Sequence, residues 1–264
     1  MEIAKGLLSL FVLNTKLKIS SSMMYRTDFV LGLFIALGYS SVGPVFQYIL
    51  FTQTKGYPGW NLHQIILFQG VLLVVTGVIG VLFGDIRSLA MELLYGGDFD
   101  RLLLKPYPPI GILLASSFTL RNAGSIFAGI ALSVYSMIML NTTLRISSLL
   151  LFLVFLLCSL VFYVALTVLY CSVAIMIIQM WRVYDFFDKL YRFGQFPLEI
   201  YPSVVQAIFV TVFPFAVGVY YPTQALLGRL DLKALFSVFG SFLLLYLCLR
   251  LWNYCLKKYT SAGG

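Results

Sequence analysis

The sequence contains few side chains that could carry out chemistry. Its single histidine is His63, and its four cysteines lack the CxxC spacing of a metal site. No Ser/His/Asp set, metal cluster or pair of carboxylates is visible, and no GxxxxGK[ST] phosphate-binding loop occurs. We therefore expect no catalytic residue and no metal ligand in this chain.

The most informative polar segment is Asp85–Pro109, with the sequence DIRSLAMELLYGGDFDRLLLKPYPP. Its first apolar residues recur at helical spacing, and Gly96-Gly97 is typical of a helix C-terminus. The three prolines that follow prevent a continuing helix. The pattern predicts a short helix, a glycine turn and a stiff charged connector, which is longer than a simple link between elements requires. We infer a docking surface for a cytosolic partner.

Long apolar stretches surround this segment. The chain is 61% hydrophobic, with a mean hydropathy of +0.95, and charged residues make up only 11% of it. A helix that crosses the hydrocarbon core needs about 20 residues, and each stretch meets or nearly meets that length. We predict an all-α integral membrane protein with six transmembrane helices, in which residues 1–264 form a single transmembrane domain. The charge-free stretches are Phe29–Phe51, Gln64–Gly84, Asn122–Leu144, Ile146–Trp181, Ile200–Gly228 and Ala234–Leu249.

The net charge of +8 could suggest nucleic acid, but its distribution indicates a membrane topology. With both termini in the cytosol, most basic residues fall on the cytosolic side, as the positive-inside rule requires. Anionic lipids are then the expected counter-charge, and nucleic acid is not an expected partner. The cytosolic basic residues are Lys5, Lys16, Lys18, Arg26, Arg87, Arg101, Lys105, Arg182, Lys189, Arg192, Arg250, Lys257 and Lys258; the outer ones are Lys55, Arg145, Arg229 and Lys233.

The N-terminal residues 1–22 predict an amphipathic helix at the cytosolic membrane surface. Apolar residues recur at helical spacing over 3–19, while Lys5 and Lys16 lie on the other side, toward lipid phosphates. A disordered leader is the alternative. The lysines prevent a cleavable signal peptide, so the first span would serve as the targeting signal.

Small residues and a proline mark the first two spans. Pro44 predicts a kink in the outer third of the first span. Gly77, Gly80 and Gly84 form one small-residue face in the second, which allows close packing of helices within the subunit or between subunits.

The third span has two registers. In the first it is Asn122–Leu144, and Arg121 is an interface anchor; in the second it begins near Ile110, and Arg121 is buried and needs a partner. We prefer the first register.

The region after the fourth stretch has two interpretations. Trp181 and Arg182 mark the cytosolic exit of that stretch and act as interface anchors. Residues 182–201 then read as a cytosolic amphipathic connector, followed by one kinked span over 201–228. The alternative makes 183–200 an unusually polar fifth span and the proline-containing region a re-entrant hairpin from outside. We prefer the single kinked span.

Two motifs resemble those of a known family. The run GGDFDRLLLKPYPP resembles the cytosolic loop of type-2 ABC exporter permeases, and FPLEIYPSVVQAIFVTVFPFAVGVYYPTQALLG resembles their fifth-span region. The resemblance implies six spans, a second permease of the same or a related kind, and a pair of separate ATP-binding subunits. ATP and Mg would bind those subunits, with no cofactor in this chain. The loop over 85–109 would be the coupling helix, with Arg87, Glu92, Asp98, Asp100 and Arg101 in the docking region.

The expected function follows from that resemblance and from the composition of the spans. The chain would be a permease in the plasma (inner) membrane, moving a hydrophobic or amphipathic substrate outward. We expect its cavity to be lined by uncharged and aromatic residues, since no Asp or Glu is expected in the middle of a span. That absence disfavours an ion- or proton-coupled secondary transporter. A non-transporting scaffold would leave the connector unexplained, and His63 alone does not indicate an enzyme.

Overall fold

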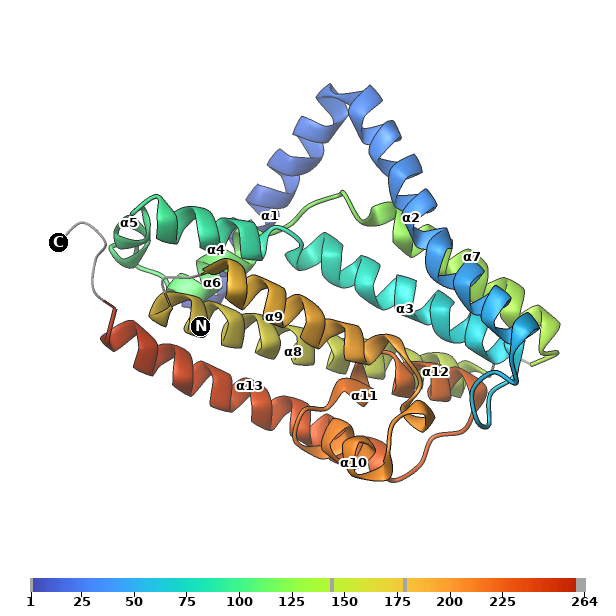
Figure 1. Ribbon diagram of the computed structural model, residues 1–264. Helices are drawn as coiled ribbons and strands as arrows, with labels where there is room; N and C mark the ends of the chain where they lie inside the picture. Colours follow the sequence, from blue (N-terminus) through green and yellow to red (C-terminus); the bar gives the residue numbers. More distant parts are fainter. Residues whose placement is uncertain (1, 143–144, 178–179, 260–264) are drawn as a thin grey trace.

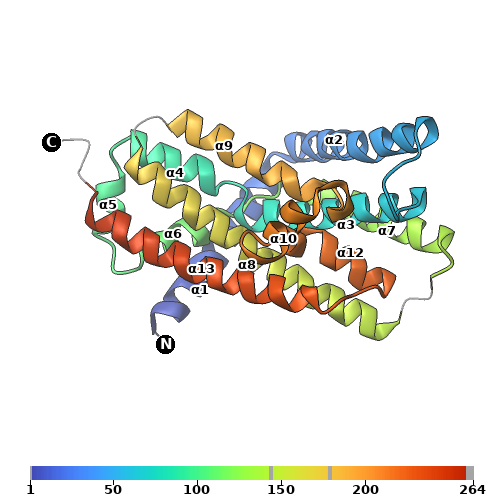
Figure 2. The ribbon, with the colours of Figure 1, turned by 60° about the horizontal axis from the view of Figure 1, so that its bottom comes forward.

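The computed structural model describes residues 2–142, 145–177 and 180–259, and all regular structure in these ranges is helical. Several long helices run nearly side by side in one elongated bundle, and the two N-terminal helices form a V against it (Figures 1 and 2). The C-terminal end of α13 (Lys233–Lys257) lies at the same end of the bundle as the short helices α4, α5 and α6 (Figure 1).

The V consists of α1 (Glu2–Met24) and α2 (Arg26–Gln53), which meet at Tyr25. The expected N-terminal segment is helical and not a disordered leader, and its position at the cytosolic membrane surface stays a prediction. No residue of α1 is buried, but the helix contacts α6 (Pro109–Ser116), where the amide of Asn14 donates to the carbonyl of Ala115 at 3.4 Å. Most large apolar side chains of α2 are exposed, as expected of a helix in contact with lipid. Pro44 lies inside α2.

The helices α3 (Leu62–Phe83) and α7 (Ala123–Met139) form a close pair. Asn61 caps α3 with a reciprocal capping box that includes Gln64. A Cβ built on Gly77 would lie 2.7 Å from Ile126 of α7, and one on Gly129 would lie 2.6 Å from the backbone of α3. The small-residue face therefore packs against α7 within the subunit, so the alternative of packing between subunits is not needed to explain it.

Three short helices form the connector: α4 (Ile86–Tyr95), α5 (Phe99–Leu103) and α6. The predicted helix end is confirmed, since Gly97 adopts a positive φ of 73° directly after α4. Non-helical backbone then separates α6 from α7, so the preferred start of the third apolar helix, next to Asn122, is confirmed.

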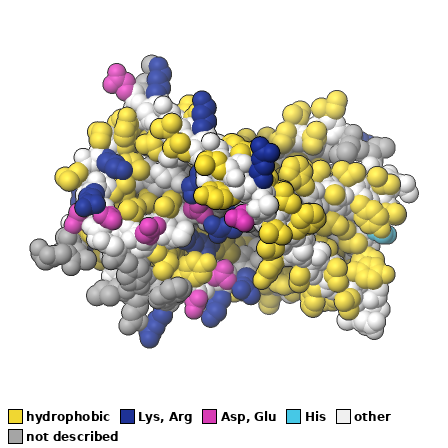
Figure 3. Space-filling model, turned by 90° about the horizontal axis from the view of Figure 1, so that it is seen from above, with side chains coloured by type: hydrophobic (Ala, Val, Ile, Leu, Met, Phe, Trp, Pro, Cys, Tyr) yellow, Lys and Arg dark blue, Asp and Glu magenta, His cyan; other side chains and the backbone are white. Residues whose placement is uncertain are grey.

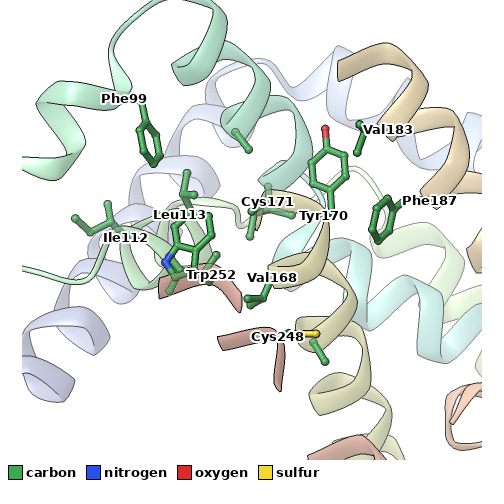
Figure 4. Packing of buried hydrophobic residues seen from close by; sticks show 14 of the residues in the cluster. Phe99, Ile112, Leu113, Val168, Tyr170, Cys171, Val183, Phe187, Cys248 and Trp252 are labelled. Carbon is green, nitrogen blue, oxygen red and sulfur yellow. The ribbon is translucent and has the colours of Figure 1, made fainter. Parts of the chain in front are cut away.

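The centre of the bundle is built on α8 (Ile146–Met176) and α13 (Lys233–Lys257). One apolar cluster joins their ends to the connector: Phe99 and Trp252 meet edge to face, and Leu113 and Val168 belong to the same cluster (Figure 4). The expected exit of the fourth span at Trp181 and Arg182 is wrong, because α8 ends at Met176 and both residues belong to the next helix.

That next helix, α9 (Met180–Arg192), runs antiparallel along α8 and continues through η1 (Phe193–Gln195) and η2 (Leu198–Ile200). Phe187 packs on Tyr170 (Figure 4). Tyr191 packs on Tyr163, so successive turns of α9 meet successively earlier turns of α8. The predicted amphipathic character is confirmed. The segment lies lengthwise against the bundle, and its predicted position at the cytosolic surface stays a prediction.

Residues 203–227 form a hairpin of three short helices: α10 (Ser203–Thr211), α11 (Phe215–Gly218) and α12 (Tyr220–Leu227). α10 lies on α13, where Ser237 donates to the carbonyl of Val210 at 2.8 Å, and α12 lies on α8, where Phe155 stacks on Tyr221. The expectation of one kinked helix is wrong. Pro214 lacks an amide hydrogen and stands at the turn, where the chain reverses.

Four helical stretches in the described residues are long and apolar enough to cross a membrane: Arg26–Gln53, Leu62–Leu94, Ile146–Met176 and Lys233–Lys257. The second of them includes α3 and α4. The apolar helix α7 is shorter, at 17 residues. The structure thus supports an all-α membrane protein, and the full set of six crossings stays a prediction.

Candidate functional site

A cavity of about 810 Å³ lies among α3, α4, α8, α9, η1 and α11, is bordered by Arg121 and Asn122 just before α7, and opens to the surface. One wall of the cavity is apolar. Ser159 of α8 also lines the cavity, and its hydroxyl oxygen lies 2.7 and 2.9 Å from the carbonyl oxygens of Val217 and Gly218, either of which can accept its one hydrogen. The cavity therefore reaches from the connector helix α4 to the turn of the 203–227 hairpin. Its apolar wall is made by Leu72, Val75, Ile79, Phe162, Phe215 and Val219.

Arg87 of α4 enters this cavity within a group of tyrosines. Its guanidinium carbon lies 4.5 Å from the ring centre of Tyr191, 5.4 Å from that of Tyr184 and 5.9 Å from that of Tyr170. These distances fall in the range of cation–π interactions, which are stronger where water is excluded. In the described part of the chain, no carboxylate lies within 4.0 Å of this guanidinium.

Two carboxylates also line the cavity, and both are paired with other cations. Asp85 lies 3.2 Å from the ammonium of Lys18 and 3.6 Å from Arg121, and Asp188 lies 3.0 Å from Arg192. The expectation of a cavity without carboxylates is therefore wrong. The i, i+4 spacing of Asp188 and Arg192 could have indicated an ion pair on one helix face, but the sequence analysis placed both residues in a surface connector.

The helix α4 has three distinct faces. Arg87 and Met91, one turn apart, line the cavity, while Ile86 and Ala90 are buried in the core and Glu92 is exposed. The expected docking set is thus divided, because Arg87 points into the cavity and does not share the exposed face of Glu92.

The rest of the expected docking set lies on or beside α5. Asp98 and Arg101 form an exposed ion pair at 3.0 Å. Asp100 lies beside Tyr259, and burial together with this carboxylate raises the pKa of the Tyr259 phenol. Leu104, at the end of α5, is 86% exposed. Apolar and charged groups thus stand together at this tip of the molecule.

The opposite end of the bundle carries a polar contact that the sequence did not reveal. Glu199 of η2 accepts from the indole nitrogen of Trp60 at 2.8 Å and from the hydroxyl of Tyr220 at 2.7 Å. Trp60 directly precedes α3, and Tyr220 begins α12. One carboxylate therefore fixes the loop before α3 to both η2 and the hairpin.

The expected membrane-interface anchors occupy exposed positions. Lys5 and Lys16 are exposed on α1, Arg182 is exposed on α9, and the Arg121 side chain is 77% exposed. The side chain of Trp181 lies outside the described residues. On the face that Figure 3 shows, charged side chains gather over the part with α4 and α5, whereas the other part is mainly apolar. This separation is typical of a protein with one end in water.

A family model described as "ABC-2 family transporter protein" matches residues 37–263. The match covers every helix from the second half of α2 to the end of α13. The comparisons with curated proteins and with solved structures gave no match.

Proposed function

The chain belongs to the ABC-2 transporter family, and we propose from that premise that it is the membrane-spanning permease of an ATP-driven exporter. A separate ATP-binding subunit would supply the energy, with ATP and Mg bound there. The substrate would be hydrophobic or amphipathic, since the cavity combines an apolar wall with a polar end. The protein would lie in the plasma membrane with both termini in the cytosol.

The arrangement of the helices supports six crossings in a revised form. α2, α3, α7, α8 and α13 would each cross once, and α9 with η1 and η2 would make the fifth crossing antiparallel to α8. Residues 203–227 would then enter from the outer side and return to it. This topology keeps both termini on one side and accounts for Glu199, beyond the end of α9, meeting Trp60, which precedes α3.

The observation that carries the proposal is the position of α4. One face of this helix lines the cavity and another is exposed beside the α5 tip, so a force applied outside would move groups inside. ATP could bias the permease only if the ATP-bound partner prefers one of its conformations. The docking surface would be formed by Glu92, Asp98, Asp100 and Arg101. Arg87, on the same helix as Glu92, would move within the cavity when the docking surface is displaced.

The polar face of α9 supports a second permease. Asp185, Lys189 and Arg192 are exposed on a segment that would cross the bilayer. Charged side chains in a crossing face protein or water, because exposure to lipid is costly. We therefore propose that α9 faces a water-filled pathway shared with a second permease of the same or a related kind.

Site-specific crosslinking tests the docking surface directly. A photoreactive residue in place of Leu104 should capture an ATP-binding subunit when the chain is expressed in its own host. Lys55, exposed between α2 and α3 at the other end of the bundle, provides the matched control position and should capture none. A connector that crosslinks to no nucleotide-hydrolysing protein would contradict the proposal.

Reversal of charge tests coupling. Glu92→Arg and Asp100→Arg should abolish transport by the complex while the complex still hydrolyses ATP, whereas Lys55→Glu should transport normally. Normal transport in both connector variants would remove the coupling assignment.

One observation favours a second candidate function, an ion-coupled secondary transporter. Asp188 lines the cavity on a segment that would cross the membrane, and ion-coupled transporters use ionisable groups at such depths. Its pairing with Arg192 reduces its suitability as a carrier of protons. Collapse of the proton gradient with ATP intact separates the two functions, because only a secondary transporter would stop.

A further inference from the structure

Arg87 differs from the other cations around the cavity in its partners. Lys18, Arg121 and Arg192 each lie within 3.6 Å of a carboxylate, whereas Arg87 is surrounded by tyrosine rings. Aromatic faces stabilise the positive charge but do not neutralise it. The guanidinium therefore keeps its full charge at the wall of an open cavity.

The charges around the cavity leave a positive excess. Asp85 and Asp188 line it, and each is paired with at least one cation of its own. An entering carboxylate or phosphate would meet Arg87 without displacing an existing acidic partner. A guanidinium offers several N–H donors in a planar fork that matches the two oxygens of such a group.

The remainder of the cavity suits a chain of carbon atoms. Val75, Ile79 and Phe162 lie on its wall between α4 and the hairpin, and Phe215 and Val219 continue that wall to the hairpin itself. A volume of about 810 Å³ falls in the range of pockets that bind drug-sized ligands.

We propose that this cavity binds an amphiphile with an anionic head group, and that Arg87 holds the carboxylate or phosphate while the apolar wall holds the tail. The inference deepens the proposed function and depends on it for the statement that the ligand is transported. The tyrosines exclude a cationic head group from the same place, because Arg87 already occupies the aromatic faces that would attract one. The anionic head could belong to a bilayer phospholipid or to a single-chain compound.

The test measures binding without ATP or transport, so a failed permease assignment and a failed ligand assignment are distinguishable. The purified chain in phosphatidylcholine nanodiscs is titrated with dansyl-undecanoic acid, with its uncharged methyl ester, and with a dansyl alkyl quaternary ammonium of similar length. Fluorescence of the dansyl group reports occupation of the cavity. We expect the acid to bind about 10-fold tighter than the ester, the gain typical of a hydrogen-bonded charge pair.

Variants assign the difference to Arg87. Arg87→Gln should bind the acid about 10-fold more weakly and the ester unchanged, and Arg87→Lys should fall between, because lysine keeps the charge without the planar fork. Arg250→Gln is the matched control, since Arg250 also lies over a tyrosine ring, Tyr246 at 5.9 Å, but is exposed outside this cavity. Its affinities should equal those of the unaltered protein.

Three results would overturn the proposal: equal affinity of the unaltered protein for acid and ester, preference for the quaternary ammonium, or an equal loss for acid and ester in Arg87→Gln. The first two need no variant, so a misfolded variant would not prevent the test. Nanodiscs with added phosphatidylglycerol identify the source of the head group. Competition with the acid would indicate a phospholipid, and unchanged affinity would indicate a single-chain compound.

Discussion

The contact of Glu199 with Trp60 and Tyr220 makes a specific prediction about the 203–227 hairpin. Both oxygens of this carboxylate accept a hydrogen bond, at 2.8 Å from the Trp60 indole and 2.7 Å from the Tyr220 hydroxyl. Glu199→Ala removes both bonds at once. We expect the hairpin to open locally more often, while the rest of the bundle stays folded.

The structure sets the size of the effect. A hydrogen bond to a charged group contributes about 1.5–3 kcal/mol, and a buried donor left without an acceptor costs about 1–3 kcal/mol. Trp60 is only 8% exposed, so its N–H would stay without an acceptor, whereas Tyr220 is only partly buried and can reach water. The lost Tyr220 bond and the unpaired Trp60 donor together give about 2.5–6 kcal/mol for local opening, which corresponds to amide exchange at least roughly 70-fold faster.

Hydrogen exchange in nanodiscs, followed by mass spectrometry, measures this opening. Peptides from residues 203–227 should exchange faster in Glu199→Ala, and peptides from α13 (Lys233–Lys257) provide the internal reference. Glu199→Gln should have about half the effect, because its amide keeps one acceptor oxygen. Glu92→Ala is the control for loss of a glutamate, since Glu92 is exposed on α4, far along the chain from the hairpin.

Two results would refute this reasoning. Exchange of the hairpin within about 3-fold of the unaltered protein would show that the carboxylate does not hold it. Equal acceleration in α13 would show that Glu199 stabilises the whole bundle and that the hairpin has no separate opening.

Two further predictions concern packing and surface charge. Gly129→Ala should lower the free energy of unfolding by about 1–3 kcal/mol, because a Cβ there would lie 2.6 Å from backbone atoms of α3. Gly38 has open space around it, so Gly38→Ala should be neutral or stabilising in the same thermal unfolding assay. Asp85→Asn should release α1 by weakening its ion pair with Lys18, at about 0.2–1 kcal/mol, so that α1 exchanges up to a few-fold faster at low salt. The difference from the unaltered protein should disappear at high salt.

Local chemistry accounts for the elements that could be predicted. The end of α4 followed from Gly96-Gly97, because the positive φ at Gly97 is available to glycine without strain. The start of α7 next to Asn122 followed from the change from Arg121 to an apolar run. These features depend on residues near one another in the chain, so no knowledge of the packing was required.

The packing of residues 182–201 was not foreseen because hydropathy assumes that a segment buried along the bundle is apolar. α9 carries Asp185, Asp188, Lys189 and Arg192 within one helix, which hydropathy reads as a surface segment. In the structure its apolar residues Val183 and Phe187 are buried against the bundle, and Asp188 lines the cavity. Whether a polar face meets water, protein or lipid depends on the neighbouring helices, which a single segment does not specify.

The sequence by itself determined that this is a helical membrane protein, that one helix ends at Gly96-Gly97 and another begins next to Asn122, and that a charged connector lies between the second and third apolar stretches. Only the tertiary structure decided that Arg87 enters a cavity, that Glu199 joins the loop before α3 to the hairpin, and that 203–227 turns back on itself. The physical reason is the distance along the chain between the residues that interact. Helix formation, capping and apolar length depend on residues a few positions apart, whereas a cavity or a shared carboxylate depends on groups more than a hundred residues apart in the chain, such as Trp60 and Glu199.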